Sequence, residues 1–445
     1  MSDVSAAPAG DGATTAGGAT TAGDGRAAIP RQAAHAGRGA GGEGRLVTGT
    51  VGRLPWDAVL AAARRIAGPG GGPAVPHAPT GLHDLAVTAA TDVLAVSRAT
   101  TRGGGAAVMS SGGTTGRPKL TYVAHHQALD RLLREWRPLS PSDTLLNLFT
   151  PGRMWASHYY MHALAERVGC DVVPAGPFDP GEVADWLGIL ADVGVNALAG
   201  TPTSLADFAQ GLLDSGLTLP VDKLIWMAEP WTPAKERTVR SAFPGVGFWG
   251  NYGSVETYVI ATNTPACDAR TLHLMPDQLL ESDDAGALLT RTGDGWTVPT
   301  VRYRLGDRIA PVSCRCGRPD GLRVLGRADD AISVHCVVVR VAEILDVVRA
   351  HPGVREAQLV LDRAGGTAHT TDRLCVRYAG DAPAGDVRAL VLRDFYHLGV
   401  LARSHPEAVT ARAVPRVSRV ERTGKIPPVV WREPARGPAP SPRDA

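Results

Sequence analysis

The stretch from Ser111 to Lys119 reads SGGTTGRPK and is the most informative part of this chain. It places small and hydroxylated residues around a turn and ends in a lysine. Such a loop offers many free backbone N–H groups, three hydroxyls and an ammonium group, which together suit a polyphosphate. It differs from the GxxxxGK[ST] loop of the common nucleotide hydrolases, because Arg117 and Pro118 follow Gly116. A polar turn between two strands is the alternative, and other segments of the chain must decide.

Further motifs follow along the chain in this order: NYGSVE at Asn251–Glu256, YRLGD at Tyr303–Asp307, GRADD at Gly326–Asp330 and RTGK at Arg422–Lys425. With the glycine-threonine loop, this order resembles the adenylate-forming superfamily of acyl-CoA ligases, luciferases and peptide-synthetase adenylation domains. YRLGD followed by CRCGR and GRADD is most similar to the phenylacetate-coenzyme A ligase branch. The resemblance covers roughly Ala107 to Val430, and ordered motifs of this kind rarely coincide by chance.

Length and composition agree with an intracellular enzyme. A chain of 445 residues exceeds the usual size of one domain, so two folded units and a tail are expected. The net charge of +2 gives no electrostatic argument for nucleic acid or an anionic membrane. No apolar run approaches the roughly 20 residues needed to span a bilayer. The N-terminus also has no apolar core suited to a secretory signal, so we expect a cytoplasmic protein.

The domain organisation that composition and the resemblance together imply has four parts. Residues 1–44 form an Ala/Gly/Thr-rich tail with almost no large apolar side chain, so it cannot offset the entropy of ordering and should be disordered. Residues 45–327 form a large adenylation domain with nucleotide and acyl sites. Residues 328–433 form a small C-terminal domain, and residues 434–445 form a second disordered tail. A targeting or docking role is the alternative to a dispensable tail.

The predicted fold class is α/β, because apolar runs alternate with amphipathic stretches from Ala107 to about Gly253. Such alternation predicts a large domain with a mostly parallel sheet covered by helices on both faces. The expected strands are TLLNLF from Thr144, DVVPA from Asp171, ALAG from Ala197, KLIWMA from Lys223 and VGFWG from Val246. The expected helices are Trp155–Val168, Pro180–Val193, Ser204–Leu213 and Pro233–Ala242. Ligands of such sheets collect beyond the carboxyl ends of the strands.

After GRADD the pattern predicts a small, mobile α+β domain. The expected strands are Ala331–Val339, Ala357–Leu361, Leu374–Tyr378 and Ala411–Pro415, and the expected helices are Ala342–Ala350 and Val387–Tyr396. This domain carries Lys425 on a loop, so the lysine can reach a site on the large domain only in one relative orientation. A hinge near Asp329 follows as a hypothesis.

The resemblance implies a role for each motif. Joining a carboxylate to AMP requires attack on the α-phosphate of ATP, so charge repulsion must be neutralised. The loop residues implied to hold the phosphates are Ser111, Gly112, Gly113, Thr114, Thr115, Gly116 and Lys119. In the next motif Tyr252 would pack on adenine beside Gly253 and Ser254, and Glu256 would hold Mg²⁺ for catalysis. The remaining implied residues are Asp307 for the ribose hydroxyls, Arg327 near the ribose and phosphate, and Lys425 as the catalytic residue. A solvated or structural role is the alternative for each of them.

The cysteines raise the question of a metal site. Six cysteines in a cytosolic chain of this size do not suggest disulfides. Cys314 and Cys316 form a CxC in SCRCGR, and Cys267 and His273 lie upstream. Four such ligands are what tetrahedral Zn²⁺ requires, and some members of the phenylacetate ligase branch are similar in having a zinc-binding insertion here. A structural zinc ion and a set of unconnected side chains both remain open.

The acyl pocket is expected near HYYMH. Trp155, His158 and Tyr159 lie where the resembling branch builds part of its carboxylate site, and Gly200 in AGTP is similar to another pocket segment. An aromatic or heteroaromatic acid would fit such a wall. His158 and His162 stand four residues apart, as a metal pair would, but no third ligand is evident from the sequence.

The acceptor of the acyl group stays open at this point. Thioester formation with CoA is the default, but Cys336 in SVHC stands where the family usually has a glycine that lets the pantetheine arm pass. An amine or a carrier protein is the alternative acceptor, and a non-catalytic nucleotide-binding module is the alternative class. The expected reaction is therefore ATP- and Mg²⁺-dependent, AMP-forming activation of a carboxylic acid, within secondary metabolism. The sequence leaves the oligomeric state open, a homodimer included.

Overall fold

The computed structural model describes residues 49–67, 72–100, 105–110, 120–125, 128–293, 300–335, 337–363 and 370–432. The loop from Ser111 to Lys119, Cys336 and the predicted tails lie outside the described residues, so the predictions made for them stay predictions. Among the helices within these ranges, none combines the length and the apolar character needed to cross a bilayer.

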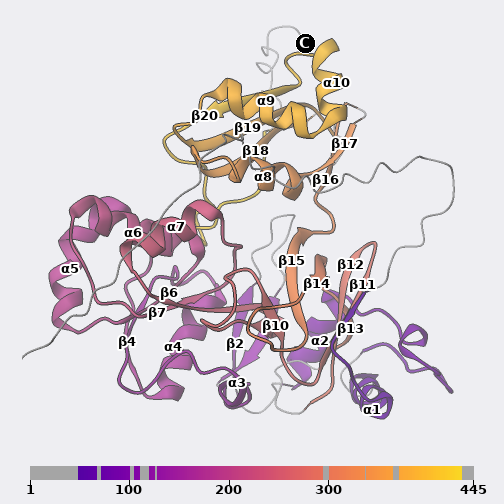
Figure 1. The fold of residues 1–445 in the computed structure, drawn as a ribbon. Helices are drawn as coiled ribbons and strands as arrows, with labels where there is room; N and C mark the ends of the chain where they lie inside the picture. The colour runs from indigo at the N-terminus through magenta and orange to yellow at the C-terminus, as the bar shows by residue number, and fades with distance from the viewer. Residues whose placement is uncertain are drawn as a thin grey trace, which may run out of the picture. The chain divides into compact units, whose positions relative to one another are not determined.

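A mixed sheet of nine strands forms the centre of the large part of the fold, in the order β14-β15-β10-β9-β8-β7-β6-β4-β5 (Figure 1). Its parallel strands are β5 (Asp171–Val173), β4 (Thr144–Asn147), β6 (Ala197–Gly200), β7 (Lys223–Trp226) and β8 (Gly247–Ser254). The antiparallel continuation consists of β9 (Tyr258–Thr262), β10 (Leu272–Leu274), β15 (Gly321–Arg327) and β14 (Asp307–Pro311). The strands predicted up to Gly250 are all present, and β8 extends into the NYGSVE motif.

Helices cover both faces of the parallel strands, as predicted for this fold class (Figure 1). One face packs on α3 (Leu129–Glu135) and α4 (Ala156–Val168). The other packs on α5 (Val183–Asp192), α6 (Pro202–Ser215) and α7 (Pro233–Ala242), and the short turn η2 (Pro180–Glu182) lies against α5 and α6. Successive strand residues face opposite sides, since Leu145 belongs to the first core and Leu146 to the second. This alternation of buried apolar residues explains why the strands read as continuous hydrophobic runs.

Two helix starts place residues that matter below. The Thr201 side chain accepts a hydrogen bond from the Ser204 backbone N–H at 3.1 Å, and α6 begins at Pro202. The Thr232 side chain accepts one from Lys235 N–H at 3.3 Å, and α7 begins at Pro233. Both are threonine caps followed by proline in the first turn. They fix Thr203 and Lys235 at the start of their helices.

A hairpin and a smaller sheet lie in the N-terminal part of the described chain. The hairpin strands β2 (Ala106–Ser110) and β3 (Leu120–Ala124) pair up to Ser110 and Leu120, so they flank the glycine-threonine loop on both sides. The four-stranded sheet consists of β1 (Thr50–Val51), β11 (Gln278–Asp283), β12 (Gly286–Arg291) and β13 (Thr300–Arg304). A third apolar core joins β13 to α1 (Trp56–Ala67), the turn η1 (Leu82–Asp84) and α2 (Ala90–Thr100).

The C-terminal segment, residues 331–432, has its own sheet and its own apolar core. The strands are β17 (Val337–Arg340), β16 (Ala331–Val334), β19 (Thr370–Gly380), β18 (Val354–Arg363) and β21 (Val429–Arg432), with β20 (Val409–Ala413) pairing with β19. The helices are α8 (Val341–Arg349), α9 (Ala384–Asp394) and α10 (Tyr396–Ser404). The described residues between 49 and 432 form one compact unit, so a domain boundary at residues 327/328 stays a prediction.

Two expectations for this segment need correction. The single strand expected at Ala331–Val339 is the hairpin of β16 and β17, because His335 takes a φ of +53° and the chain reverses there. The helix expected at Val387–Tyr396 is α9, which ends at Asp394 because Phe395 leaves the helical region with φ −112° and ψ 84°, and the helix α10 that begins at Tyr396 was not predicted.

Candidate functional site

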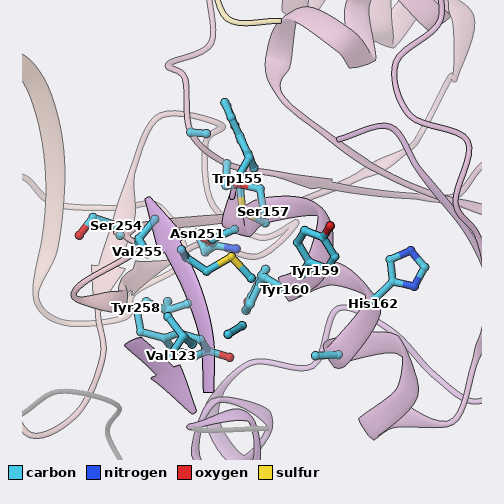
Figure 2. A pocket seen from close by; sticks show the side chains of 18 of the residues that line it. Val123, Trp155, Ser157, Tyr159, Tyr160, His162, Asn251, Ser254, Val255 and Tyr258 are labelled. Carbon is cyan, nitrogen blue, oxygen red and sulfur yellow. The ribbon is translucent and has the colours of Figure 1, made fainter. Parts of the chain in front are cut away.

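A cavity of about 510 Å³ lies among β2, β3, α4, β8 and β9, and most of its lining is apolar (Figure 2). Trp155 and Tyr160 contribute aromatic rings from the start of α4 and from within it, and Tyr258 contributes another from β9. The ring centroids of Tyr160 and Tyr258 stand 5.5 Å apart in an edge-to-face arrangement. Lys425 also lines this cavity, although it lies more than 160 residues further along the chain.

The cavity includes some of the predicted acyl-pocket residues and omits others. Trp155 and Tyr159 line it, whereas His158 and Gly200 are not among its lining residues. The His158 Nδ1 atom lies 2.7 Å from the Phe149 carbonyl, so this histidine is part of the packing of α4 on β4. Gly200 lies at the buried end of β6, where an added Cβ would come within 2.5 Å of Ser204 Oγ. His162, the other half of the suggested histidine pair, does line the cavity.

Lys425 reaches the cavity from the loop between β20 and β21. Its Nζ lies 4.7 Å from the centre of the Trp155 indole ring, a cation–π contact. Burial lowers the pKa of Lys425, the Glu229 carboxylate opposes this change, and Arg422 adds to it. In the same loop the Arg422 guanidinium donates to Ser110 Oγ at 2.9 Å and to the Arg153 carbonyl at 3.1 Å. The RTGK motif therefore lies against the strand that enters the glycine-threonine loop.

The residues predicted for the nucleoside are brought together at one place. The Tyr252 hydroxyl donates to Asp307 Oδ2 at 2.7 Å, and Arg327 Nη1 donates to Asp307 Oδ1 at 3.3 Å. Burial raises the pKa of Asp307, while the hydrogen bond from Tyr252 and the charge of Arg327 oppose this. Gly306 has a φ of +74°, and a Cβ there would lie 2.5 Å from the Arg327 guanidinium. The positive φ thus favours a glycine in YRLGD.

The turn between β8 and β9 shapes the rest of NYGSVE. Ser254 and Thr257 exchange hydrogen bonds between side chains and backbone, with Thr257 N–H donating to Ser254 Oγ at 3.2 Å. An added Cβ at Gly253 would lie 1.8 Å from the Tyr258 carbonyl oxygen, so the hairpin accepts only glycine there. Gly253 and Ser254 line the cavity, whereas Tyr252 and Glu256 lie outside its lining.

Glu256 has the donor atoms that a hard cation requires. Its Oε1 accepts a hydrogen bond from the Tyr303 hydroxyl at 2.9 Å, and burial raises the pKa of that tyrosine, with Glu256 adding to the effect. Its Oε2 is buried and has no hydrogen-bond partner among the described residues. A buried carboxylate oxygen that is left unsatisfied suits Mg²⁺, which prefers carboxylate and phosphate oxygens.

The four predicted zinc ligands form a cluster whose ligand atoms all lie within 4.8 Å of one another. Cys267 Sγ and Cys316 Sγ are 3.6 Å apart, and Cys316 Sγ is 3.2 Å from His273 Nε2. A tetrahedral zinc ion with ordinary Zn–S bonds would separate two sulfurs by ~3.8 Å. The other ring nitrogen of His273, Nδ1, lies 2.7 Å from the Pro319 carbonyl, an outer contact that would direct Nε2 toward a metal. The four residues predicted as zinc ligands, Cys314 included, therefore lie together in the structure.

The hinge residue predicted at Asp329 lies between β15 and β16. Its side chain is more than half exposed, and it accepts a hydrogen bond from Arg327 Nε at 3.1 Å. The following residue, Asp330, instead accepts from the Ala342 backbone N–H at 3.1 Å and so belongs to the packing of α8. A hinge at Asp329 stays a prediction.

The sequence analysis missed a buried group of charges between α7 and the C-terminal segment. Lys235 Nζ lies 2.5 Å from Glu356 Oε2 on β18, and Arg349 on α8 lies 2.7 Å from the same carboxylate. Lys235 Nζ also lies 3.9 Å from Glu229. These residues are scattered along the chain and belong to no recognised motif, so no local sequence pattern predicts that they lie together.

Because of this group of charges, we expect the free energy of unfolding to depend on pH under acidic conditions. Burial alone would raise the pKa of Glu356, but Lys235 and Arg349 outweigh it and lower the pKa from 4.5 to about 2. A carboxyl whose pKa is lower in the folded state stabilises above its unfolded pKa and loses that contribution as pH falls through the folded one. We therefore expect the free energy of unfolding to decrease between about pH 4.5 and pH 2, by on the order of 3 kcal/mol from this group.

Urea unfolding at a series of pH values, on the unmodified protein and on Glu356→Gln, checks this expectation. The replacement should flatten the acid limb, which is the decrease in the free energy of unfolding as the pH falls. Glu281→Gln is a matched control, because Glu281 is also paired, with Arg302 at 3.3 Å, yet its pKa is raised, chiefly by burial. Its replacement should leave the acid limb in place. An acid limb equally steep in Glu356→Gln and in the unmodified protein would contradict the assignment.

A family model described as AMP-binding enzyme matches residues 83–305, half of the chain. The chain therefore belongs to the AMP-binding enzymes, and the predicted membership of the adenylate-forming superfamily is confirmed. The finer placement in the phenylacetate-coenzyme A ligase branch stays a prediction.

Relatives of this chain include two curated proteins. It is 26% identical over 203 residues to the indoleacetate–lysine synthetase of Pseudomonas savastanoi, across 44% of this chain and 51% of that protein. It is 35% identical over 127 residues to the isonitrile lipopeptide synthase of Streptomyces coeruleorubidus, across 28% of this chain and 8% of that protein. The matches thus span about half or less of these relatives.

Among solved structures, 2-hydroxyisobutyryl-CoA ligase in its postadenylation state, in complex with R3-HIB-AMP, is similar with a TM-score of 0.59 at 18% identity. The similarity covers 84% of this chain and 85% of that one, and at this identity it shows the fold alone.

Proposed function

We propose that this protein is an ATP-dependent, AMP-forming ligase that activates a carboxylic acid as its acyl adenylate and passes the acyl group to an acceptor. The observation that carries the proposal is the position of Lys425, which lines the same cavity as Asn251, Gly253 and Ser254 of the NYGSVE motif. A cation at that place suits an anionic reaction centre beside a nucleotide.

In this proposal the residues around Asp307 bind the nucleoside. Tyr252 and Arg327 each donate to one oxygen of the Asp307 carboxylate, so its orientation is fixed before a ribose arrives. The remaining lone pairs of the carboxylate are available to the two ribose hydroxyls. Glu256 would hold Mg²⁺ through Oε2, and the metal would supply charge neutralisation at the phosphates.

Lys425 has the central part in the chemical step. Attack of a carboxylate oxygen on the α-phosphorus forms the acyl phosphate bond and breaks the bond to pyrophosphate, which leaves. Negative charge accumulates on the phosphoryl oxygens during this step. An ammonium group held in a cavity of low polarity stabilises such charge far better than one in water.

The acid proposed as substrate is aromatic or heteroaromatic. The cavity is lined largely by apolar atoms and by the rings of Trp155, Tyr160 and Tyr258, and flat rings pack well against such walls. The name of one relative, an indoleacetate–lysine synthetase, is in keeping with an aromatic acid.

The default acceptor is the thiol of CoA. A nitrogen nucleophile is a second candidate, favoured by two observations: Cys336 replaces the glycine expected for the pantetheine arm, and the curated relative of P. savastanoi is named for joining an acid to lysine. Supplying CoA or amines such as lysine to enzyme that has formed its adenylate, and identifying the product by mass, separates a thioester from an amide.

Pyrophosphate release across a panel of aryl, heteroaryl and fatty acids tests the proposal. Release that requires both ATP and a supplied acid, and that is fastest with an aromatic member, is the expected result. ATP binding without release for any acid would instead indicate a nucleotide-binding module without turnover.

We also propose that Cys267, His273, Cys314 and Cys316 hold a structural Zn²⁺. The cluster ties the segment before β10 to the loop between β14 and β15. Asp307 begins β14 and Arg327 ends β15, so the metal would fix the far end of the hairpin that carries both nucleoside-binding residues. Its role would be to hold the hairpin, since all four positions of the tetrahedron are filled by protein.

A further inference from the structure

Glu229 connects the large sheet to the loop that carries Lys425. It follows Ala228, which has a φ of +77°, an unusual conformation that turns the chain after β7. Its Oε2 accepts hydrogen bonds from Thr203, from the hydroxyl at 2.6 Å and from the backbone N–H at 3.2 Å. Its Oε1 accepts from the Ile426 backbone N–H at 2.9 Å. One carboxylate therefore holds both the start of α6 and the residue next to Lys425.

The same carboxylate is part of the buried group of charges. Lys235 lies between Glu229, at 3.9 Å, and Glu356 of β18, at 2.5 Å. The side chains of Lys235, Glu229 and Glu356 are only 9%, 8% and 7% exposed. Removing one member of such a group leaves an uncompensated buried charge, so the members depend on one another. Glu229 is thus held rigidly from two sides before it contacts Ile426.

The buried Gln358 side chain also holds the β20–β21 loop, donating to the Ser418 carbonyl at 3.2 Å and to the Pro427 carbonyl at 3.3 Å, whereas the ion pairs of the loop lie nearer to solvent. Arg416 pairs with Asp179 at 2.9 Å, with both side chains more than half exposed. Arg419 donates to Asp207 at 2.5 Å, with the arginine 29% exposed. The exposed pair of Arg416 and Asp179 contributes little to stability, and the pair of Arg419 and Asp207 is only partly buried. The contact through Glu229 is buried and joins the large sheet to the residue next to Lys425, so it is suited to fix the backbone there.

We propose that Glu229 is a positioning residue for Lys425: its carboxylate fixes the Ile426 backbone and so sets the ammonium group in the cavity, while the Lys235–Glu356 pair holds Glu229 and β18 together. This inference rests on the proposed adenylation reaction. The inference predicts that Glu229 contributes to the rate only through Lys425. Direct contact of Glu229 with the substrates is not part of the proposed role.

The test is a double-mutant cycle on acid-dependent pyrophosphate release. Glu229→Ala should lower the turnover number about 10- to 100-fold, which is what the loss of a charge-assisted hydrogen bond can cost, with ATP affinity unchanged. Glu229→Gln keeps an acceptor oxygen and should fall between Ala and the unmodified protein. In a Lys425→Ala background, Glu229→Ala should lower the rate no further than 2- to 3-fold, because residues that act as a unit are not additive.

Glu281→Gln serves as the control. Glu281 is also a largely buried carboxylate with an ion-pair partner, and it is distant in sequence from the β20–β21 loop. Its turnover number should stay within about 2-fold of the unmodified protein. A full, additive effect of Glu229→Ala in the Lys425→Ala background, or equal losses in ATP affinity and turnover, would overturn the positioning role. No release by the unmodified protein with any acid would refute the proposed reaction itself, a different outcome.

Discussion

Lys425→Ala is expected to lower the rate of acyl-adenylate formation about 100- to 1000-fold, the range found when one preorganised charge-stabilising group is removed from an active site. The reason is the place of the ammonium group: it lies over the Trp155 ring, inside an apolar cavity, where a charge interacts strongly with a developing anion. Acid-dependent pyrophosphate release under saturating ATP measures the effect.

Two controls separate this role from a loss of structure. The affinity for ATP should change little, because the predicted nucleoside contacts at Asp307 come from other elements. Lys425→Arg keeps the charge but has a planar head group, and it should recover only part of the rate. Turnover of Lys425→Ala equal to that of the unmodified protein would refute the catalytic role.

Cys316→Ala is expected to remove the bound zinc and to lower the midpoint of thermal unfolding by about 5–10 °C, since loss of a metal ligand is one of the few single changes that cost several kcal/mol. Cys316 is chosen because its sulfur approaches both Cys267 and His273. Elemental analysis of protein purified without chelator, together with calorimetry, measures both quantities.

Cys375→Ser is the matched control for this experiment. Cys375 lies in the C-terminal segment and does not belong to the cluster. Like Cys316, it is half-buried and forms no disulfide. Its replacement should leave the zinc content at one equivalent. Zinc well below one equivalent in the unmodified protein, with Cys314→Ser equally stable, would remove the site.

The part of the fold that could be predicted is the part with strong local patterns. Strands such as Ala197–Gly200 and Lys223–Trp226 are buried on both faces and read as short apolar runs, and Thr232–Pro233 marks a helix start in the sequence. The hairpin at β16 and β17 could not be predicted, because its turn uses His335 at positive φ where no glycine, proline or asparagine signals a reversal.

The residues of the candidate site are likewise of two kinds, those that a local sequence pattern predicts and those that it does not. Asp307, Arg327 and Lys425 could be predicted as site residues because they lie in motifs, and the cluster around Cys316 could be predicted because its residue types match one metal. Glu229 was not predicted, since AEP reads as an ordinary loop and its hydrogen-bond partners, Thr203 and Ile426, lie in distant segments. Sequence patterns reveal residues that act within a motif, whereas residues that act through tertiary contacts require the structure.

The most direct measurement follows oxygen from the acid to the nucleotide. The protein is incubated with ATP, Mg²⁺, an acceptor and the best acid of the panel, labelled with ¹⁸O in its carboxylate, and the AMP is analysed by mass. Formation of an acyl adenylate predicts one labelled oxygen in each AMP, because the carboxylate oxygen stays on phosphorus when the acyl group leaves. AMP without label, or ADP and phosphate in its place, would contradict the account.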